Sequence, residues 1–542
     1  MSPYLVGLAT YFGQWDADNK QLRNDLPFAP EPRADFAKLK PFVSAPAATL
    51  TDYVKVERQA KNAGQTVSAG WRNISREMNH ERLGWLKSSL NYQNQTTKLS
   101  PEMAAKLYGH LDPDVLKQAT AAGDNFDWTA VSDDQRHNTL ATSISQLQTF
   151  YRNPYEYFLK FGLDLQKREE LEITNANSGT FYHDSLEAFV RLLKQNQVKL
   201  AELADDQLAF YVAKAMDWAF SRQPSVVELA ENYERIAYQK HHLEQTVLTM
   251  ARVLRNQAQY SASHPVTTEQ KFGHVGLLDD RHDSQPSYRA LIYETKIRNQ
   301  KSSQPDLKRK VYLRGRIDRV DAVRGDQQDY LTVVDYKSAN KEFDLVDAYE
   351  GLDLQMLTYL NNLQANLDIA NPDRQSAIAG ALYLHLFDPH YQYKNIIKKN
   401  PEITELQNHE FKGILLNDDA VLRQIDEGLA AAKPNPLVLG VSYTKSKDLI
   451  KAKKGSLLVD QEQMNRLLAR NKQLIIAAAQ QIFSGNVELK PFRRDQRTGL
   501  DYSDYLDIYH FDNLLDQEKY REIILTDDDV MKKLKDEGAN NE

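Results

Sequence analysis

A carboxylate and an amine stand two residues apart in an apolar segment, and together they could serve a metal-dependent hydrolysis. They are Asp335 and Lys337, in Leu331-Thr-Val-Val-Asp-Tyr-Lys-Ser. Side chains alternate across a β-strand, so both would project from the same face. Asp335 could bind Mg²⁺, while Lys337 could position or activate the attacking water. The Asp-x-Lys pattern also occurs by chance at solvated strand edges, so the pair alone does not establish this function.

A second carboxylate, Asp318, lies upstream in the segment Gly315-Arg-Ile-Asp-Arg-Val-Asp. Arg324-Gly-Asp separates the two segments and is typical of a turn, so we predict a β-hairpin. The hairpin can place Asp318 beside Asp335. Two oxygen ligands at one strand end suit Mg²⁺, which keeps several waters and binds phosphate oxygens.

Three further residues could complete the site, although each also has a structural interpretation. Gln355 and Tyr359 stand at i and i+4 of a predicted helix and therefore share a face. Gln355 interrupts an apolar stripe and needs a polar partner, which a buried structural hydrogen bond would also provide. His183 follows an apolar helical stripe, where a core histidine is the more frequent interpretation.

The elements that must position these residues indicate an α/β protein. Helical periodicity extends over about 140–260, short β-rich segments follow over 264–337, and residues 1–138 are predicted to be mainly helical. The strands and helices expected from 264 onward are strands at 288–297, 311–323, 330–337, 377–387 and 411–417 and helices at 346–366, 419–432 and 460–484.

Composition limits the protein's class. The 542 residues include 68 Lys plus Arg and 75 Asp plus Glu, a net charge of −7 that excludes a uniformly basic DNA coat. The absence of cysteine excludes disulfides and thiolate-bound metals and fits a reducing compartment. No apolar stretch is long enough to span a membrane, so we expect a cytoplasmic location.

A local cluster of basic residues between Lys296 and Arg319 could contact DNA near the predicted metal site. A solvated charged face is an equally good interpretation. We expect backbone contacts with little sequence preference. The residues assigned to DNA binding are Lys308, Arg309, Lys310, Arg314, Arg316 and Arg319.

Four motifs in this order resemble the RecB-type branch of the PD-(D/E)XK nucleases. They are Gly179-Thr-Phe-Tyr-His183, Gly315-Arg-Ile-Asp318-Arg, Asp335-Tyr-Lys337 and Gln355-x-x-x-Tyr359. The flanking segments Ser143-Ile-Ser-Gln-Leu-Gln and Gly485-Asn-Val-Glu-Leu-Lys-Pro-Phe are similar to those in the AddB/RexB family of helicase–nuclease subunits.

The resemblance implies a mixed central sheet flanked by helices and a Mg²⁺ ion held by His183, Asp318, Asp335 and the Tyr336 carbonyl. Lys337 would then serve the water, and Gln355 and Tyr359 would support the site. It also implies an exonuclease that digests the 5′-terminated strand during double-strand-break repair and recombination, in a heterodimer with an AddA/RexA-type partner. The implied domains are a helicase-like remnant over 1–138, the nuclease over 139–515 and a polar tail over 516–542.

Two departures from the family pattern limit these expectations. No Gly-x-x-x-x-Gly-Lys-Ser/Thr phosphate loop occurs, so we expect no ATPase motor in this chain. We also expect no iron–sulfur cluster, because Asn153, Leu500, Ser503 and Tyr509 occupy the positions where relatives have cysteine ligands. A catalytically idle DNA-binding scaffold and a RecB-like nuclease of phage or defence origin are the alternatives.

Overall fold

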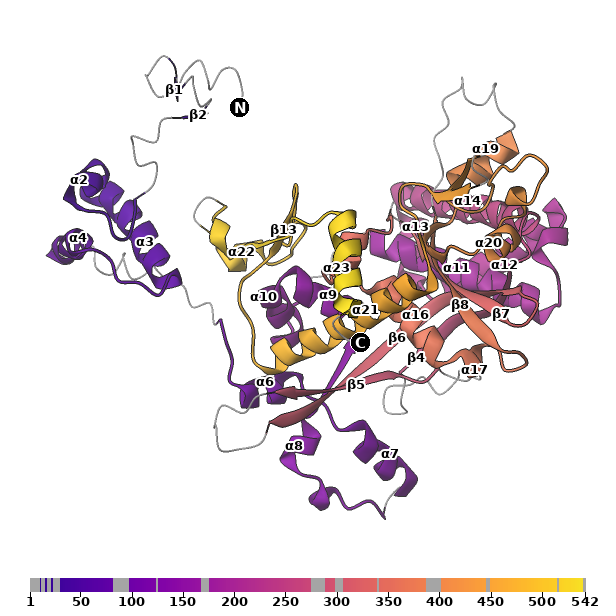
Figure 1. Cartoon of the computed structure of the whole chain (residues 1–542), viewed down its shortest axis with the longest axis horizontal. Coiled ribbons are helices and arrows are strands. Elements are labelled where there is room, and N and C mark those ends of the chain that lie inside the picture. Colours follow the sequence, from indigo (N-terminus) through magenta and orange to yellow (C-terminus); the bar gives the residue numbers. More distant parts are fainter. Residues whose placement is uncertain are drawn as a thin grey trace. The chain divides into compact units, whose positions relative to one another are not determined.

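A computed structural model describes the chain in two compact units (Figure 1). One unit is Met1–Thr96 with Leu506–Tyr520, and the other is Thr97–Tyr505 with Arg521–Glu542. The described residues are all but 1–9, 11–14, 17–20, 23–29, 81–96, 123–124, 167–174, 274–287, 298–305, 339–340, 387–400, 445–448, 514–515 and 540–542.

The smaller unit is mainly helical and has its own core. Trp71 and Val56 are fully buried at its centre, and the Trp71 indole donates a hydrogen bond to the Glu31 carbonyl. Its elements are β1 (Trp15–Asp16), β2 (Gln21–Leu22), α2 (Phe36–Leu39), η1 (Lys40–Phe42), α3 (Pro46–Asn62), α4 (Ala69–His80), α22 (Leu506–Tyr509) and η8 (Gln517–Lys519).

The larger unit is built on one mixed sheet, whose strand order is β12-β9-β8-β7-β6-β3, with β4 and β5 also paired to β6. The long strand β6 pairs through its first half with β3 and β5 and through its second half with β4 and β7. The strands are β3 (Thr139–Ser143), β4 (His264–Phe272), β5 (Leu291–Ile297), β6 (Leu307–Arg324), β7 (Asp329–Lys337), β8 (Ser376–His385), β9 (Lys412–Leu416) and β12 (Leu457–Val459).

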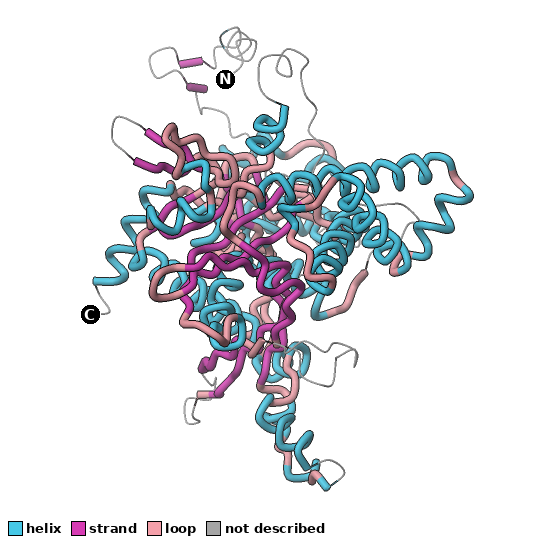
Figure 2. Tube along the Cα trace, turned by 90° about the vertical axis from the view of Figure 1, so that its right-hand side faces the viewer, coloured by secondary structure: helices cyan, strands magenta, loops and turns pink. Residues whose placement is uncertain are grey.

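Helices cover both faces of this sheet, as Figure 2 shows. Consecutive residues of β7 point to opposite faces, so Val333 packs with helices α16 and α21 and Val334 packs with α11, α12 and α14. These helices are α11 (Asn175–Gln195), α12 (Asp205–Ser221), α14 (Glu234–Ala258), α16 (Gln355–Ala365) and α21 (Gln461–Phe483). Because both faces of β7 are covered, seven of its nine residues are buried, polar ones included.

The other described elements of the larger unit are short and connect or cover the sheet. The helices are α6 (Pro101–Tyr108), α7 (Pro113–Ala122), η3 (Trp128–Ala130), α8 (Asp133–Arg136), α9 (Ile144–Arg152), α10 (Pro154–Tyr157), the π-helix η4 (Phe158–Gly162), η5 (Leu200–Glu202), α13 (Pro224–Asn232), α15 (Leu345–Tyr349), α17 (Leu367–Ala370), α19 (Pro401–Asn408), α20 (Asp419–Ile425), η6 (Glu427–Leu429) and α23 (Asp527–Ala539). The strands are β10 (Val441–Thr444), β11 (Leu449–Ala452), β13 (Phe492–Arg494), β14 (Arg497–Thr498) and β15 (Arg521–Glu522).

The predicted α/β architecture and the β6–β7 hairpin are confirmed, with the hairpin turn closed by a hydrogen bond from the Gly325 amide to the Gln328 carbonyl. Two predicted helices differ. The helix expected over 419–432 ends at Ile425, and the 3-10 helix η6 follows it. The helix expected over 346–366 is two helices, α15 and α16, separated at Gly351. This glycine has a φ of +84°, and a Cβ atom there would lie 2.6 Å from the Tyr151 ring.

The boundaries of the two units also differ from the boundaries of the predicted domains. Residues 97–138 belong with the mixed sheet of the larger unit, because His110 pairs with Thr139 and Lys310 binds Asp112. The predicted polar tail includes β15 and α23, whose Val530 and Leu534 are buried. The composition of α23, a few apolar residues among many charged ones, is typical of a polar tail, so composition alone did not indicate a packed helix. Among the described residues, no helix is both long and apolar enough to cross a membrane.

Candidate metal centre

The β6–β7 hairpin brings the two predicted carboxylates together. Asp318 on β6 is 7% exposed and Asp335 on β7 is 1% exposed. The Tyr336 amide donates to Asp318 Oδ2 at 2.9 Å, which fixes the carboxylate against the neighbouring strand. The Lys337 ammonium lies 2.5 Å from Asp335 Oδ2.

The three flanking residues predicted from sequence also lie at this site. His183 Nδ1 on α11 is 3.2 Å from Asp318 Oδ2. The Gln355 amide at the start of α16 donates to Asp335 Oδ1 at 2.8 Å and to the Tyr359 hydroxyl at 3.1 Å. The polar partner that Gln355 needs is therefore a carboxylate of the site. Gly351 sets the start of the helix that Gln355 begins.

Glu269 on β4 is a site residue that the sequence analysis missed. Ligand atoms of His183, Glu269 and Asp318 all lie within 4.8 Å of one another. Glu269 has a φ of +51°, unusual for a residue other than glycine, and this local irregularity aims its side chain at Asp318. Nothing in the pattern of residues 264–272 marks such a conformation, so an acid in that strand carried no readable signal.

The carboxylates of the site disfavour each other's charge. Burial, and then the charge of Asp318, raise the pKa of Asp335 to about 6. Burial and the same neighbour raise the pKa of Glu269 to about 8. Burial alone would lower the pKa of His183, but its hydrogen bond to Asp318 raises it above the usual value. Burial works against the charge of Asp318, yet the His183 contact lowers the pKa of Asp318.

This donor set fits a hard divalent cation. Carboxylate oxygens and one imidazole nitrogen converge, and a cation among them would offset the repulsion that raises the two carboxyl pKa values. The site opens into a pocket of about 560 Å³, to which Gly179, Arg314, Arg316, Lys337 and Ser338 contribute. A polymer end could therefore reach Asp318 and Lys337, which line this pocket.

The basic residues assigned to DNA divide into two groups. Arg314 and Arg316 line the pocket, where Arg316 Nε pairs with Glu269 Oε2 at 2.6 Å, and Lys308 is exposed. Arg309 binds Asp134, and Lys310 binds Asp112 and Asp114.

Arg319 does not face the pocket. It is 6% exposed, and its guanidinium binds Asp321 on the other face of the sheet. A buried, paired guanidinium does not reach a phosphate, so Arg319 is not positioned to contact DNA. The number of basic residues in the sequence did not indicate which face of β6 each of them occupies.

Asn153 and Leu500, two of the positions where relatives have cysteine ligands, lie in segments of the larger unit that pack against each other. Asn153 is fully buried and its side chain accepts from the Tyr155 amide at the start of α10. A Cβ atom on Gly499 would lie 2.2 Å from the Arg152 carbonyl, so the segment before Leu500 packs directly against this turn. Close backbone packing joins the two segments.

Comparison with known proteins agrees with this geometry. The relatives include the B-type subunit of the ATP-dependent helicase/deoxyribonuclease of Limosilactobacillus fermentum, 38% identical over 99% of this chain and 42% of the relative. The proteins of the same name from Limosilactobacillus reuteri and Lactiplantibacillus plantarum are 37% and 34% identical, over 96% and 81% of this chain and 41% and 33% of those relatives.

The chain therefore spans about two fifths of the length of the first two relatives. The family model of the PD-(D/E)XK nuclease superfamily matches residues 141–496, which contain every element that contributes to the metal centre. The chain belongs to the PD-(D/E)XK nuclease superfamily.

Proposed function

We propose that the chain is the nuclease part of an AddB/RexB-type helicase–nuclease subunit and acts as a Mg²⁺-dependent DNA exonuclease. The observation that carries the proposal is that His183, Glu269, Asp318, Asp335 and Lys337, from four separate elements, lie close together beside one open pocket, which His183, Asp318 and Lys337 line. Side chains so distant in sequence meet beside a polymer-sized opening, which fits phosphodiester cleavage better than a purely structural role.

In this proposal the carboxylates, His183 and the Tyr336 carbonyl would hold the metal. A bound Mg²⁺ would supply charge neutralisation at the scissile phosphate and make water a better nucleophile. Lys337 would orient the attacking water and offset negative charge that develops on the phosphate. Gln355 would orient the Asp335 carboxylate by donating to Asp335 Oδ1, and the Tyr359 hydroxyl would hold the Gln355 amide in place.

DNA would enter along the basic wall of the pocket. Arg314 and Arg316, which line the pocket, would bind phosphates, Arg316 while also pairing with Glu269, and Lys308 would extend this path along β6. Such contacts address the backbone, so cleavage would depend weakly on base sequence. We also propose the cytoplasm as the location and an AddA/RexA-type motor as the partner, with digestion of the 5′-terminated strand during double-strand-break repair and recombination.

The test is cleavage of single-stranded DNA labelled at its 5′ or 3′ end, with Mg²⁺ or with EDTA. We expect Mg²⁺-dependent release of short products from linear DNA and resistance of covalently closed circles. Asp335→Asn is the matched inactive variant. DNA binding without cleavage, both by the chain alone and with the AddA/RexA-type motor added, would favour the idle scaffold instead. Failure of the active chain to associate with that motor would favour an independent RecB-like nuclease.

A further inference from the structure

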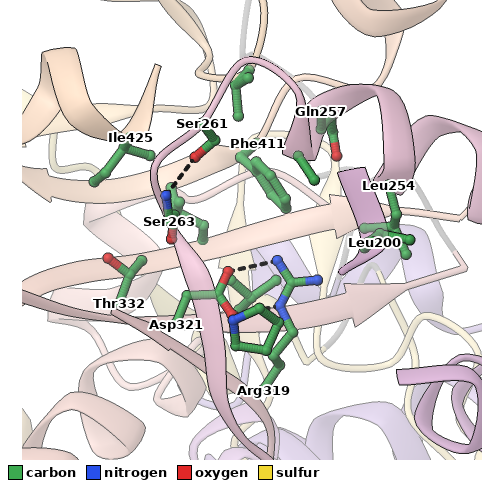
Figure 3. A pocket seen from close by; sticks show the side chains of 15 residues that line it. Leu200, Leu254, Gln257, Ser261, Ser263, Arg319, Asp321, Thr332, Phe411 and Ile425 are labelled. Atoms are coloured by element: carbon green, nitrogen blue, oxygen red, sulfur yellow. Dashed lines mark hydrogen bonds and ion pairs between the residues drawn. The ribbon is translucent and has the colours of Figure 1, made fainter. Parts of the chain in front are cut away.

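A buried polar network lies on the face of the sheet opposite the metal centre. Arg319 Nε and Nη2 donate to the two oxygens of Asp321 at 2.7 and 2.6 Å, and Nη1 donates to the Tyr336 hydroxyl at 3.0 Å. Figure 3 shows the Arg319 guanidinium and the Asp321 carboxylate side by side at a small pocket, with Thr332 and Leu254 nearby. The pocket, about 50 Å³, is lined mainly by apolar atoms.

The Arg319–Asp321 pair joins no two elements, because both residues stand on β6 and are only two positions apart. Replacing such a buried pair by apolar residues often leaves stability unchanged or higher, so stabilisation alone does not account for it. The third guanidinium contact is different, since it crosses from β6 to the Tyr336 hydroxyl on β7.

Tyr336 in turn contacts the metal centre at two points. Its amide donates to Asp318 Oδ2, and its ring meets the His183 ring edge to face with a centroid distance of 5.9 Å. Tyr336 also stands between Asp335 and Lys337 in the strand. A shift of Tyr336 would therefore disturb its contacts with Asp318 and His183.

We propose that Arg319, fixed by Asp321, is a positioning residue that acts through the Tyr336 hydroxyl to hold Asp318 and His183 in metal-binding geometry. The inference rests on the proposed metal site. Because consecutive side chains of a strand point to opposite faces, Asp318 and Asp335 lie on the face of the metal centre, while Arg319 and Tyr336 hold the same part of β6 and β7 from the opposite face. Partners that orient metal ligands typically change metal affinity when removed.

The first experiment compares Tyr336→Phe with the parent chain. The phenylalanine keeps the ring against His183 and removes only the hydroxyl that Arg319 binds. We expect the Mg²⁺ concentration for half-maximal cleavage to rise about tenfold, with the maximal rate largely recovered at saturating Mg²⁺. Ca²⁺ binding measured by calorimetry, without DNA or turnover, should weaken by a similar factor.

Tyr151→Phe is the matched control, because the Tyr151 hydroxyl is also bonded, to the Leu474 carbonyl at 2.7 Å, but lies in a different part of the larger unit. It should keep the parental Mg²⁺ requirement. If both variants shift the metal requirement equally, or if neither does, the positioning role is wrong.

A second variant distinguishes the loss of positioning from a loss of folding. Arg319→Met combined with Asp321→Leu removes both charges, so no buried ion remains unpaired. We expect parental thermal stability together with weaker Ca²⁺ binding, and parental Ca²⁺ affinity in this folded variant would overturn the proposal. Cleavage that persists in Asp335→Asn would refute the metal site itself, whereas an inactive Asp335→Asn beside a normal Tyr336→Phe would refute only the positioning role.

Discussion

The two oxygens of the Asp335 carboxylate contact different side chains. Gln355 donates to Oδ1 and the Lys337 ammonium lies against Oδ2. One oxygen is thus held by a neutral donor that fixes orientation, and the other by a cation that also faces the pocket. Loss of the amide should impair metal geometry, whereas loss of the ammonium should impair the chemical step.

Lys337→Ala should therefore reduce Mg²⁺-dependent cleavage by about 100-fold or more, because a group that acts directly in proton transfer commonly contributes that much. DNA binding and folding should persist, since the side chain lies at the pocket rather than in the core. The measurement is single-turnover cleavage beside a DNA-binding titration. Lys412→Ala is the control, because Lys412 on β9 is a partly buried lysine paired with Glu342. Equal activity of Lys337→Ala and the parent would contradict the site.

The raised carboxyl pKa values predict how stability depends on pH in the metal-free protein. A carboxyl group whose pKa is higher when folded binds its proton more tightly in the folded state, so its contribution is present at low pH and lost as pH rises through the folded value. The pKa of Asp335 is about 6 and that of Glu269 about 8. With EDTA present, the free energy of unfolding should fall between about pH 4, where these carboxyl groups ionise in the unfolded chain, and about pH 8, the pKa of Glu269 in the folded protein.

Glu269→Gln cannot ionise and should make that decline shallower, which urea unfolding at several pH values would measure. Added Mg²⁺ should raise the stability of the parent most at the alkaline end, where the carboxylates are charged. A decline of the same steepness in Glu269→Gln would show that another group causes it.

At the scale of elements, Gly351 separates α15 from α16 and so determines where Gln355 begins its helix. Gly351→Ala should lower the free energy of unfolding by more than about 1 kcal/mol, since alanine is strained at a positive φ and its Cβ would meet the Tyr151 ring. Gly455→Ala is the control in urea unfolding. Gly455 has a nearly equal φ of +83°, but its Cβ would meet only the flexible Glu342 side chain. Equal losses would exclude the Tyr151 contact as the cause.

The hairpin and the strands β5, β6, β7, β8 and β9 were predictable, because alternation, β-branched residues and a glycine turn are local signals. The same signals placed Asp318 and Asp335 together. Strand β3 was not predicted, since it lies at the start of a stretch with helical periodicity. Glu269 was not predictable, because it depends on a positive φ in β4 and on a pairing with β6 from far along the chain. The burial of Arg319 was missed for a related reason: charge density in a sequence does not say which face of a strand a residue occupies.

At the scale of the whole chain, the two units differ in whether they contain residues of the candidate metal centre. The described ligands of the metal centre all belong to the larger unit. The relatives are named ATP-dependent helicases as well as deoxyribonucleases, yet this chain matches only part of their length.

We predict no DNA-stimulated ATP hydrolysis by this chain alone, because its sequence has no phosphate-binding Gly-x-x-x-x-Gly-Lys-Ser/Thr loop. Phosphate release measured with and without single-stranded DNA would check this, with an added AddA/RexA-type motor as the positive control. ATP turnover by the purified chain at a rate that depends on DNA would contradict the prediction.

The length of β6 has a consequence for how the protein is made. Thr139 of β3 pairs with Lys310 of β6, and β4, β5 and β7 pair with β6 as well. During synthesis, β3 and helices α11, α12 and α14 leave the ribosome before β6 exists, so their apolar faces have no sheet to cover. Pairing between such distant segments is slow, and unfinished chains that expose apolar surface aggregate readily. The yield of folded protein should therefore depend on slow translation and on chaperones that shield those helices until the central strand emerges.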